Sequence, residues 1–156
     1  GQPGEIIVRG YLVMKGYFND QDGTAKAIDA RGYFHTGDVG FFDEDGYLKI
    51  TDRIKDMYMV GGFNCYPAEI ENVLMQMPGV AQAAVIGIPD ERMGEVGKAY
   101  VIPSAGAQLT EAAVISWSRE HMANYKVPRI VEFTETFPLT ASGKVLKTEL
   151  RARHNI

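Results

Sequence analysis

The amino-acid sequence predicts an α+β fold in which a β-rich segment precedes a small mixed sheet with flanking helices. Short strand patterns and turn residues dominate residues 1–51, whereas helical and strand patterns alternate from residue 67 onward. In the second part the order is strand, helix, strand, strand, helix, strand, helix. This is the order of an α+β sandwich of about 100 residues, which is an ordinary size for one domain.

The first segment contains one short strand pattern and one hairpin pattern. Residues 5–9 form the strand candidate, and the polar stretch 19–30 predicts a short helix or a loop. Residues 40–42 and 47–50 flank the turn Asp43-Glu44-Asp45-Gly46, which is a strong hairpin signal. The acidic turn lacks the spacing and the terminal Glu of an EF-hand, so we expect a solvated hairpin and no metal site.

The first helix expected in the second part is amphipathic. Pro67 stands in its first turn, and Pro78-Gly79 ends the pattern. The apolar residues recur at the spacing of a core-facing stripe, namely Ile70, Val73, Leu74 and Met77.

The remaining elements follow in order. The apolar runs 80–88 and 98–102 predict two strands whose composition suits the middle of a sheet. Thr110 is the expected N-cap of a helix that runs towards Met122. Residues 130–133 predict a third strand, and residues 145–153 predict a closing basic helix.

Composition excludes several classes of function. The chain has 156 residues, of which 46% are hydrophobic, a formal net charge of -4 and a pI near 5.4, so it offers no basic footprint for nucleic acid. No apolar run reaches the length of a membrane span. The single Cys65 cannot form an intramolecular disulfide, and we expect an inert packed thiol. Together with the lack of a signal sequence, this favours a cytoplasmic setting.

A turn near the C-terminus presents one lysine. The run Pro-Leu-Thr-Ala-Ser-Gly-Lys at 138–144 ends in Lys144, whose ammonium suits a phosphate or a carboxylate. It is not a P-loop, because Pro138 stands where that motif needs Gly and Val145 stands where it needs Ser or Thr. Taken alone, the run also fits an ordinary surface turn.

Three further motifs precede this turn in order, at 4–17 (GEIIVRG leading to Gly-Tyr), 33–38 (YFHTGD) and 52–71 (DRIKD to GGFNCYPAEIE). Together the four motifs resemble the adenylate-forming superfamily of acyl-CoA synthetases, luciferases and peptide-synthetase adenylation domains over essentially the whole chain. The resemblance implies that 1–52 end a large N-terminal AMP-binding domain, 53–55 form a hinge and 56–156 form a mobile C-terminal lid domain. The family's phosphate loop is missing and the chain starts at Gly1, so we expect part of a longer protein.

The resemblance also implies roles for three nucleotide-facing residues. Asp38 matches the aspartate that binds the ribose hydroxyls of ATP, although an Asp here also fits a self-stabilised turn. Arg53 matches an arginine that reaches the ribose and phosphates, with Asp52 in place of the more common Gly. Lys144 matches the catalytic adenylation lysine, which contacts the carboxylate and the α-phosphate. His35 receives no catalytic role.

Other residues of the same motifs match positions that the family uses for the lid movement and for binding CoA. Lys55 falls at the hinge position, and the alternative is a plain surface lysine. Gly61 and Gly62 match the stretch that lines the pantetheine tunnel of CoA, and they also suit a tight hairpin. Met59 departs from the Lys that many relatives have.

Four further basic residues stand at positions 126, 129, 147 and 151. Lys126 and Arg129 are candidates for the CoA phosphates, although exposed basic residues are common. Lys147 and Arg151 are expected to be solvated helix charges.

The resemblance implies a ligase that makes an acyl-CoA thioester from a carboxylic acid, ATP with Mg²⁺, and CoA through an acyl-adenylate. The run 60–67 is closer to fatty-acyl-CoA ligases, so a fatty acid, long-chain included, is the expected substrate. The expected partners are these small molecules and the missing N-terminal domain, with neither nucleic acid nor a membrane span. We expect the chain alone to be inactive. A non-catalytic CoA- or protein-binding module and an adenylation domain for a different carboxylate are the alternatives.

Overall fold

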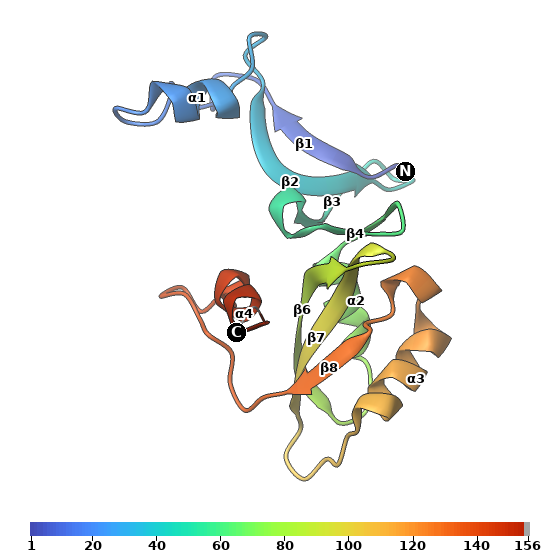
Figure 1. Ribbon diagram of the computed structural model, residues 1–156. Coiled ribbons are helices and arrows are strands. Elements are labelled where there is room, and N and C mark those ends of the chain that lie inside the picture. The colour runs from blue at the N-terminus through green and yellow to red at the C-terminus, as the bar shows by residue number, and fades with distance from the viewer. Residues whose placement is uncertain (155–156) are drawn as a thin grey trace. The chain divides into compact units, whose positions relative to one another are not determined.

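A computed structural model describes residues 1–154 of the chain (Figure 1). The chain divides into two compact units, Gly1–Lys55 and Asp56–Ile156, and each is described by itself. Residues 155 and 156 of the predicted lid lie outside the described part. None of the helices in the described part is long and apolar enough to cross a membrane. The identification of the first unit as the end of a larger domain, and of 53–55 as a hinge, stays a prediction.

The first unit is a three-stranded antiparallel sheet with one short helix. The polar stretch 19–30 contains this helix, which begins after Asp20, whose side chain accepts a hydrogen bond from the backbone N–H of Gly23 at 2.8 Å. The predicted hairpin joins two of the strands through Asp43, whose carboxylate accepts the N–H groups of Asp45 and Tyr47. The acidic turn therefore uses this carboxylate to stabilise its own backbone. The elements are β1 (Gly4–Val8), α1 (Gln21–Ala27), β2 (Phe34–Phe42) and β3 (Leu48–Arg53).

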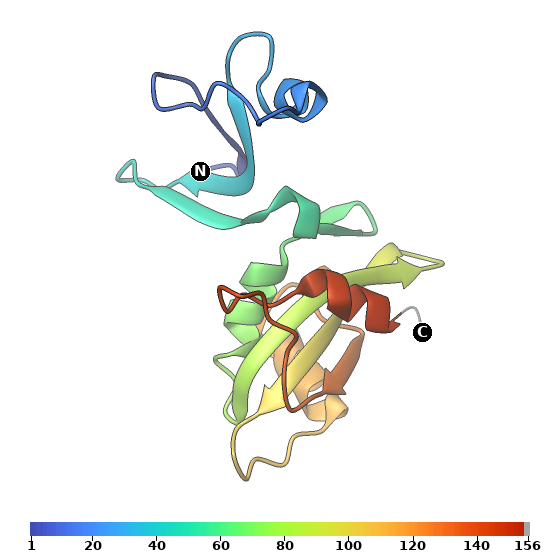
Figure 2. The same ribbon diagram turned by 90° about the vertical axis from the view of Figure 1, so that its left-hand side faces the viewer.

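The second unit is a five-stranded mixed sheet with three α-helices. The strand order is β5-β4-β7-β6, and β8 pairs in parallel with β7. Figures 1 and 2 show α4 against one face of this sheet and α2 and α3 against the other. The α+β class predicted from the sequence is therefore confirmed. The strands are β4 (Tyr58–Val60), β5 (Phe63–Cys65), β6 (Val80–Asp90), β7 (Gly94–Pro103) and β8 (Ile130–Phe133); the helices are α2 (Pro67–Leu74), α3 (Glu111–His121) and α4 (Lys147–His154), with the 3-10 turn η2 (Asn124–Lys126). A further 3-10 turn, η1 (Ile54–Asp56), spans the sequence boundary between the two units.

Two apolar clusters pack on the two faces of this sheet. Along β7, Ala99 and Val101 belong to the cluster that contains Ile70 and Val114, from α2 and α3. Tyr100 belongs to the second cluster, on the opposite face, which also contains Leu150 of α4. Because helices cover both faces, neighbouring positions on a strand are both apolar, and the sequence shows a run without alternation.

One expectation about the sheet was wrong. The run 80–88 was expected in the middle of the sheet, but β6 stands at its edge and β7 occupies the centre. Burial of both faces of β6, by α2 on one side and α4 on the other, explains the apolar composition without a second neighbouring strand.

Two helix starts can be compared with the sequence. Thr110 caps α3 as expected, since its hydroxyl accepts the N–H of Ala113 at 3.2 Å. The closing helix begins at Lys147 and not at Val145, because Val145 forms a β-bridge with Leu139.

Candidate functional site

Asp38 and Arg53 face each other across β2 and β3 of the first unit. They are register partners, and Arg53 Nε donates to Asp38 Oδ1 at 2.9 Å. Asp52, the residue before Arg53, is buried and accepts the backbone N–H of Arg53 at 2.6 Å. The Arg53 bond uses Nε and one carboxylate oxygen. The second oxygen and the terminal guanidinium nitrogens suit sugar hydroxyls and phosphate oxygens.

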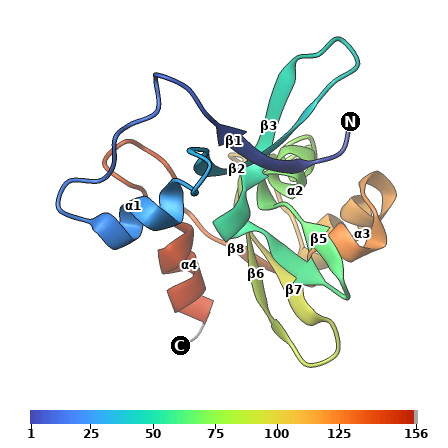
Figure 3. The same ribbon diagram turned by 90° about the horizontal axis from the view of Figure 1, so that it is seen from above.

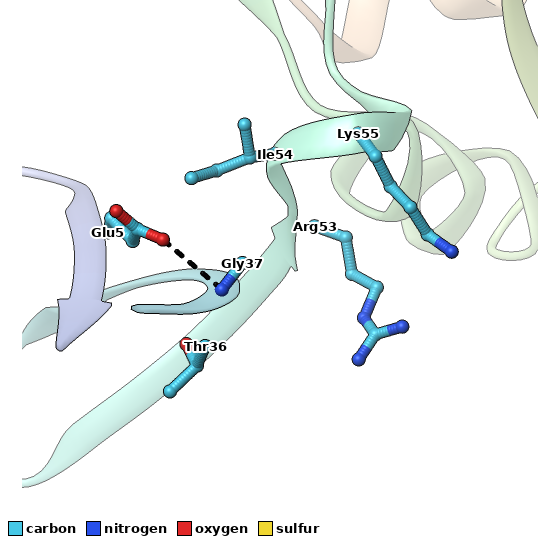
Figure 4. Close-up of a pocket in the computed structure, with 6 residues that line it drawn as sticks. All are labelled: Glu5, Thr36, Gly37, Arg53, Ile54 and Lys55. Atoms are coloured by element: carbon cyan, nitrogen blue, oxygen red, sulfur yellow. Dashed lines mark hydrogen bonds between the residues drawn. The ribbon is translucent and has the colours of Figure 1, made fainter. Parts of the chain in front are cut away.

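A pocket of about 320 Å³ lies beside this pair within the first unit. Figure 4 shows the side chains of Arg53 and Lys55 extending in the same direction, away from Glu5. The pocket thus combines two cationic side chains with one carboxylate. Its lining consists of Glu5, Thr36, Gly37, Arg53, Ile54 and Lys55.

Glu5 was not recognised from the sequence as part of this region. One of its oxygens accepts the N–H of Gly37 at 3.2 Å, and the other lies 2.7 Å from His35 Nδ1. Thr36 adds a second link, because its hydroxyl donates to the carbonyl of Ile6 at 2.7 Å. These bonds from β1 hold the backbone that leads into Asp38. The only sequence signal was the position of Glu5 in the first motif.

Lys144 lies on a turn that is closed by its own hydrogen bonds. Its carbonyl accepts the N–H of Thr140 at 2.7 Å, and its N–H donates to the Thr140 hydroxyl at 3.0 Å. Gly143 has a φ of +80°, a left-handed conformation that glycine adopts without strain. The side chain of Lys144 is exposed, so the turn presents an ammonium from an ordered backbone.

The expectation that Lys147 and Arg151 are solvated charges was wrong. Lys147 Nζ lies 2.7 Å from Glu71 Oε1, and Arg151 Nη2 lies 3.2 Å from Asp56 Oδ1. Both acidic partners are far away in the sequence, so a helical charge pattern could not reveal them. The two ion pairs fasten α4 to the rest of the second unit.

Gly61 and Gly62 form the two-residue turn between β4 and β5. Their φ values are +56° and +89°, and Val60 pairs with Phe63 across the turn. A type I′ turn of this kind needs positive φ at both central residues, so the hairpin itself explains both glycines. A Cβ on Gly62 would meet no atom within 4 Å, which leaves open space beside it.

Tyr58 anchors this hairpin in the sheet. Its ring lies against Gly87 and Gly97, where a Cβ would come within 2.3 Å of Tyr58 Cβ and 2.4 Å of its hydroxyl oxygen. The hydroxyl is buried and finds no hydrogen-bond partner among the described residues, and burial raises the pKa of the Tyr58 phenol. The pair of glycines in β6 and β7 makes a slot that holds the ring.

Other predicted residues near the hairpin have local partners. Lys126 Nζ lies 2.5 Å from Glu69 Oε1, so any contact with a CoA phosphate competes with this pair. Phe63 stacks on Tyr125, with ring centroids 4.7 Å apart. Cys65 is fully buried, and burial raises the pKa of its thiol to about 11, as expected for an inert packed residue.

The second unit separates two of the predicted sites. Figures 1 and 3 show the β4–β5 hairpin tip and the turn that precedes α4 on opposite sides of this unit. The structure thus pairs Asp38 with Arg53 in the first unit, and Arg53 and Lys55 line one pocket there. It keeps the lysine turn and the glycine turn apart in the second.

Comparison with known proteins identifies the family. Residues 69–144 match the AMP-binding enzyme C-terminal domain. The chain is 58% identical over 97% of its length to 3-[(3aS,4S,7aS)-7a-methyl-1,5-dioxo-octahydro-1H-inden-4-yl]propanoyl:CoA ligase of Rhodococcus jostii. It is 51% identical over 98% to feruloyl-CoA synthase of Amycolatopsis sp and 46% identical over 97% to long-chain-fatty-acid--CoA ligase of Escherichia coli O157:H7. It spans 29%, 31% and 27% of the length of these relatives.

Solved structures agree. ATP-bound MatB from Rhodopseudomonas palustris matches with a TM-score of 0.93 at 40% identity, over 99% of this chain and 31% of MatB. The amide bond synthetase McbA from Marinactinospora thermotolerans matches with a TM-score of 0.91 at 40% identity, with the same coverage. The chain therefore belongs to the adenylate-forming AMP-binding enzymes, and its residues 69–144 carry their C-terminal domain.

Proposed function

We propose that this chain is the C-terminal portion of an acyl-CoA ligase that activates a carboxylic acid with ATP and transfers the acyl group to CoA. The observation that carries the proposal is the extent of the similarity. At least 97% of the chain aligns with three relatives that are named as ligases or synthases of an acyl-CoA, so the aligned region includes Asp38, Arg53 and Lys144. A free binding module without chemistry has no physical need for all three side chains.

In the first half-reaction, a carboxylate oxygen attacks the α-phosphorus of ATP, which arrives with Mg²⁺, and pyrophosphate leaves. Asp38 accepts hydrogen bonds from the ribose hydroxyls, and Arg53 donates to the ribose and phosphate oxygens. Lys144 places its ammonium where negative charge develops on the carboxylate and the α-phosphate. A preorganised donor at such a position is worth about 2.7–4 kcal/mol in other enzymes.

In the second half-reaction, the CoA thiol loses its proton to solvent and its sulfur attacks the acyl carbonyl, the bond between the carbonyl carbon and the AMP oxygen breaks, and AMP leaves. The open space beside Gly62 suits the thin pantetheine arm, and the turn cannot carry side chains there without strain. We assign the change between the two steps to rotation at Lys55. Such domain movements are a common way for one enzyme to run two steps.

Two solved forms of one relative match this chain to different degrees. Over 99% of this chain, MatB matches with a TM-score of 0.93 in its ATP-bound form and 0.70 in its apo form. Because both values refer to the same protein, the two MatB structures must differ within the compared region.

The acyl group is proposed to be a hydrophobic carboxylic acid. Long-chain fatty acids are one candidate, supported by the relative named for them at 46% identity. Two relatives with higher identity, 58% and 51%, are named for a ring-bearing propanoyl group and for ferulate. We therefore include ring-bearing acids in the substrate class. ATP and CoA are both available in the cytoplasm, which is the proposed location.

The test compares the two half-reactions in the complete ligase. Lys144→Ala should slow carboxylate-dependent pyrophosphate release about 100- to 1,000-fold, while thioester formation from supplied acyl-adenylate stays near the wild-type rate. Arg153→Ala, which removes an exposed charge from α4, is the matched control. If Lys144→Ala slows both half-reactions equally, the assigned role of Lys144 is wrong.

The similarity to McbA favours one second candidate, formation of an amide from the acyl-adenylate. Supplying an amine in place of CoA decides between them. Product formation with amines only would replace the thioester proposal, and product formation with CoA only would remove the amide candidate.

A further inference from the structure

Resting on the proposed function, we propose that Lys147 and Arg151 are positioning residues for Lys144, because their ion pairs hold helix α4 and the turn before it at a fixed place. Neither residue touches substrate in this proposal. They act through the backbone that carries the adenylation lysine.

The lysine turn and α4 form one continuous piece. Lys147 follows Lys144 by three positions, and the N–H of Leu146 donates to the carbonyl of Pro138 at 2.8 Å. With the β-bridge between Leu139 and Val145, this bond closes the turn at the point where α4 begins. Any shift or rotation of α4 therefore moves the Lys144 ammonium with it.

Glu71 of α2 gives the first fixed point. Its Oε1 accepts from Lys147 Nζ at 2.7 Å and from the backbone N–H of Val85 at 2.7 Å. The two side chains are only 15% and 16% exposed, so water screens this pair less than a surface pair. The bond to β6 also fixes the carboxylate itself, which makes Glu71 a rigid support.

Arg151 and its neighbour give the second fixed point. Arg151 pairs with Asp56, the residue at which the second unit begins. Leu150 is fully buried, and its carbonyl accepts a hydrogen bond from the Tyr100 hydroxyl at 3.1 Å. The helix is thus held at both of its turns, once to α2 and once to the segment next to the proposed hinge.

The first test measures order in the turn and needs no activity. Lys147→Met keeps most of the side-chain length and removes the charge, and Arg153→Met is its control on the same helix. Amide hydrogen exchange at Gly143 and Lys144, whose N–H groups are bonded to Thr140, should become at least about 10-fold faster in Lys147→Met only. Unchanged exchange at these amides would overturn the proposal.

The second test measures the consequence in the complete ligase. Lys147→Met should slow the adenylation half-reaction about 10- to 100-fold, since a displacement near 1 Å can have that effect, and should leave thioester formation from supplied acyl-adenylate unchanged. Lys147→Arg, which keeps the charge opposite Glu71, should retain most of the adenylation rate. A role in folding alone would slow both half-reactions together and would overturn the proposal.

The two proposals fail in different ways. If Lys144→Ala slows adenylation and Lys147→Met does not, the positioning role is wrong and the proposed function stands. If Lys144→Ala leaves adenylation unchanged while Lys147→Met loosens the turn, the anchoring of the turn stands and the catalytic assignment fails.

Discussion

The glycine slot around Tyr58 gives a prediction that the structure makes quantitative. Gly97→Ala would place a Cβ 2.4 Å from the Tyr58 hydroxyl oxygen and 3.3 Å from Cζ. Tyr58→Phe removes the hydroxyl, so the remaining nearest ring atom lies at a tight but tolerable distance. The effects of the two substitutions on the free energy of unfolding should therefore be strongly non-additive.

Each change has its own expected effect on the free energy of unfolding. Gly97→Ala overpacks a close contact in the sheet and should lower the free energy of unfolding by about 1–3 kcal/mol. Tyr58→Phe removes a buried hydroxyl that has no partner among the described residues, so it should raise the free energy by about 1 kcal/mol. In the double variant most of the loss should disappear, which gives a coupling energy of at least about 1 kcal/mol.

Urea unfolding of the chain, followed by tryptophan fluorescence, measures these values. Trp117 is the single tryptophan and packs against the core of the second unit, so its signal reports on the relevant sheet. Additive effects of the two substitutions, together with a destabilising Tyr58→Phe, would refute the packing argument.

Further predictions concern other parts of the chain. Leu150→Ala, at a fully buried position of α4, should lower the free energy of unfolding by about 3–5 kcal/mol in the same assay. Gly62→Val should destabilise the hairpin by at least about 1 kcal/mol and, in the complete ligase, slow thioester formation more than adenylation. Cys65 should react with iodoacetamide at pH 8 only in urea, because burial raises its pKa to about 11; rapid labelling of the folded chain would contradict this. The chain alone should release no pyrophosphate with any fatty acid and ATP, and release above background would contradict the proposal that it is part of the ligase.

The sequence predicted those features that depend on local patterns. The acidic hairpin, the cap at Thr110 and the helix starting at Pro67 each follow from residues within one or two turns of chain. The closeness of Asp38 and Arg53 was expected only from the resemblance, since fifteen positions separate them, and the register of β2 and β3 provides the contact.

Features that depend on distant parts of the chain were missed or wrong. The partners of Lys147 and Arg151 lie in α2 and at Asp56, and no periodicity in the C-terminal helix indicates them. The position of β6 at the sheet edge was missed because burial by two helix layers produces the same composition as burial between strands. The contacts of Glu5 could not be predicted because its partners, His35 and Gly37, become its neighbours only when β1 pairs with β2.

The packing of the second unit bears on how the two proposed half-reactions can be served. The lysine turn is fastened through α4 to one face of the sheet, while Tyr58 fastens the glycine hairpin from within the cluster on the other face. Both anchors belong to one closely packed body, and packed cores do not deform continuously. The distance between the two turns therefore does not change when the structure rearranges only locally. If each turn serves one step at the same bound substrate, exchange between them requires the whole unit to turn. We propose residues 53–55, the expected hinge, as the place of that rotation.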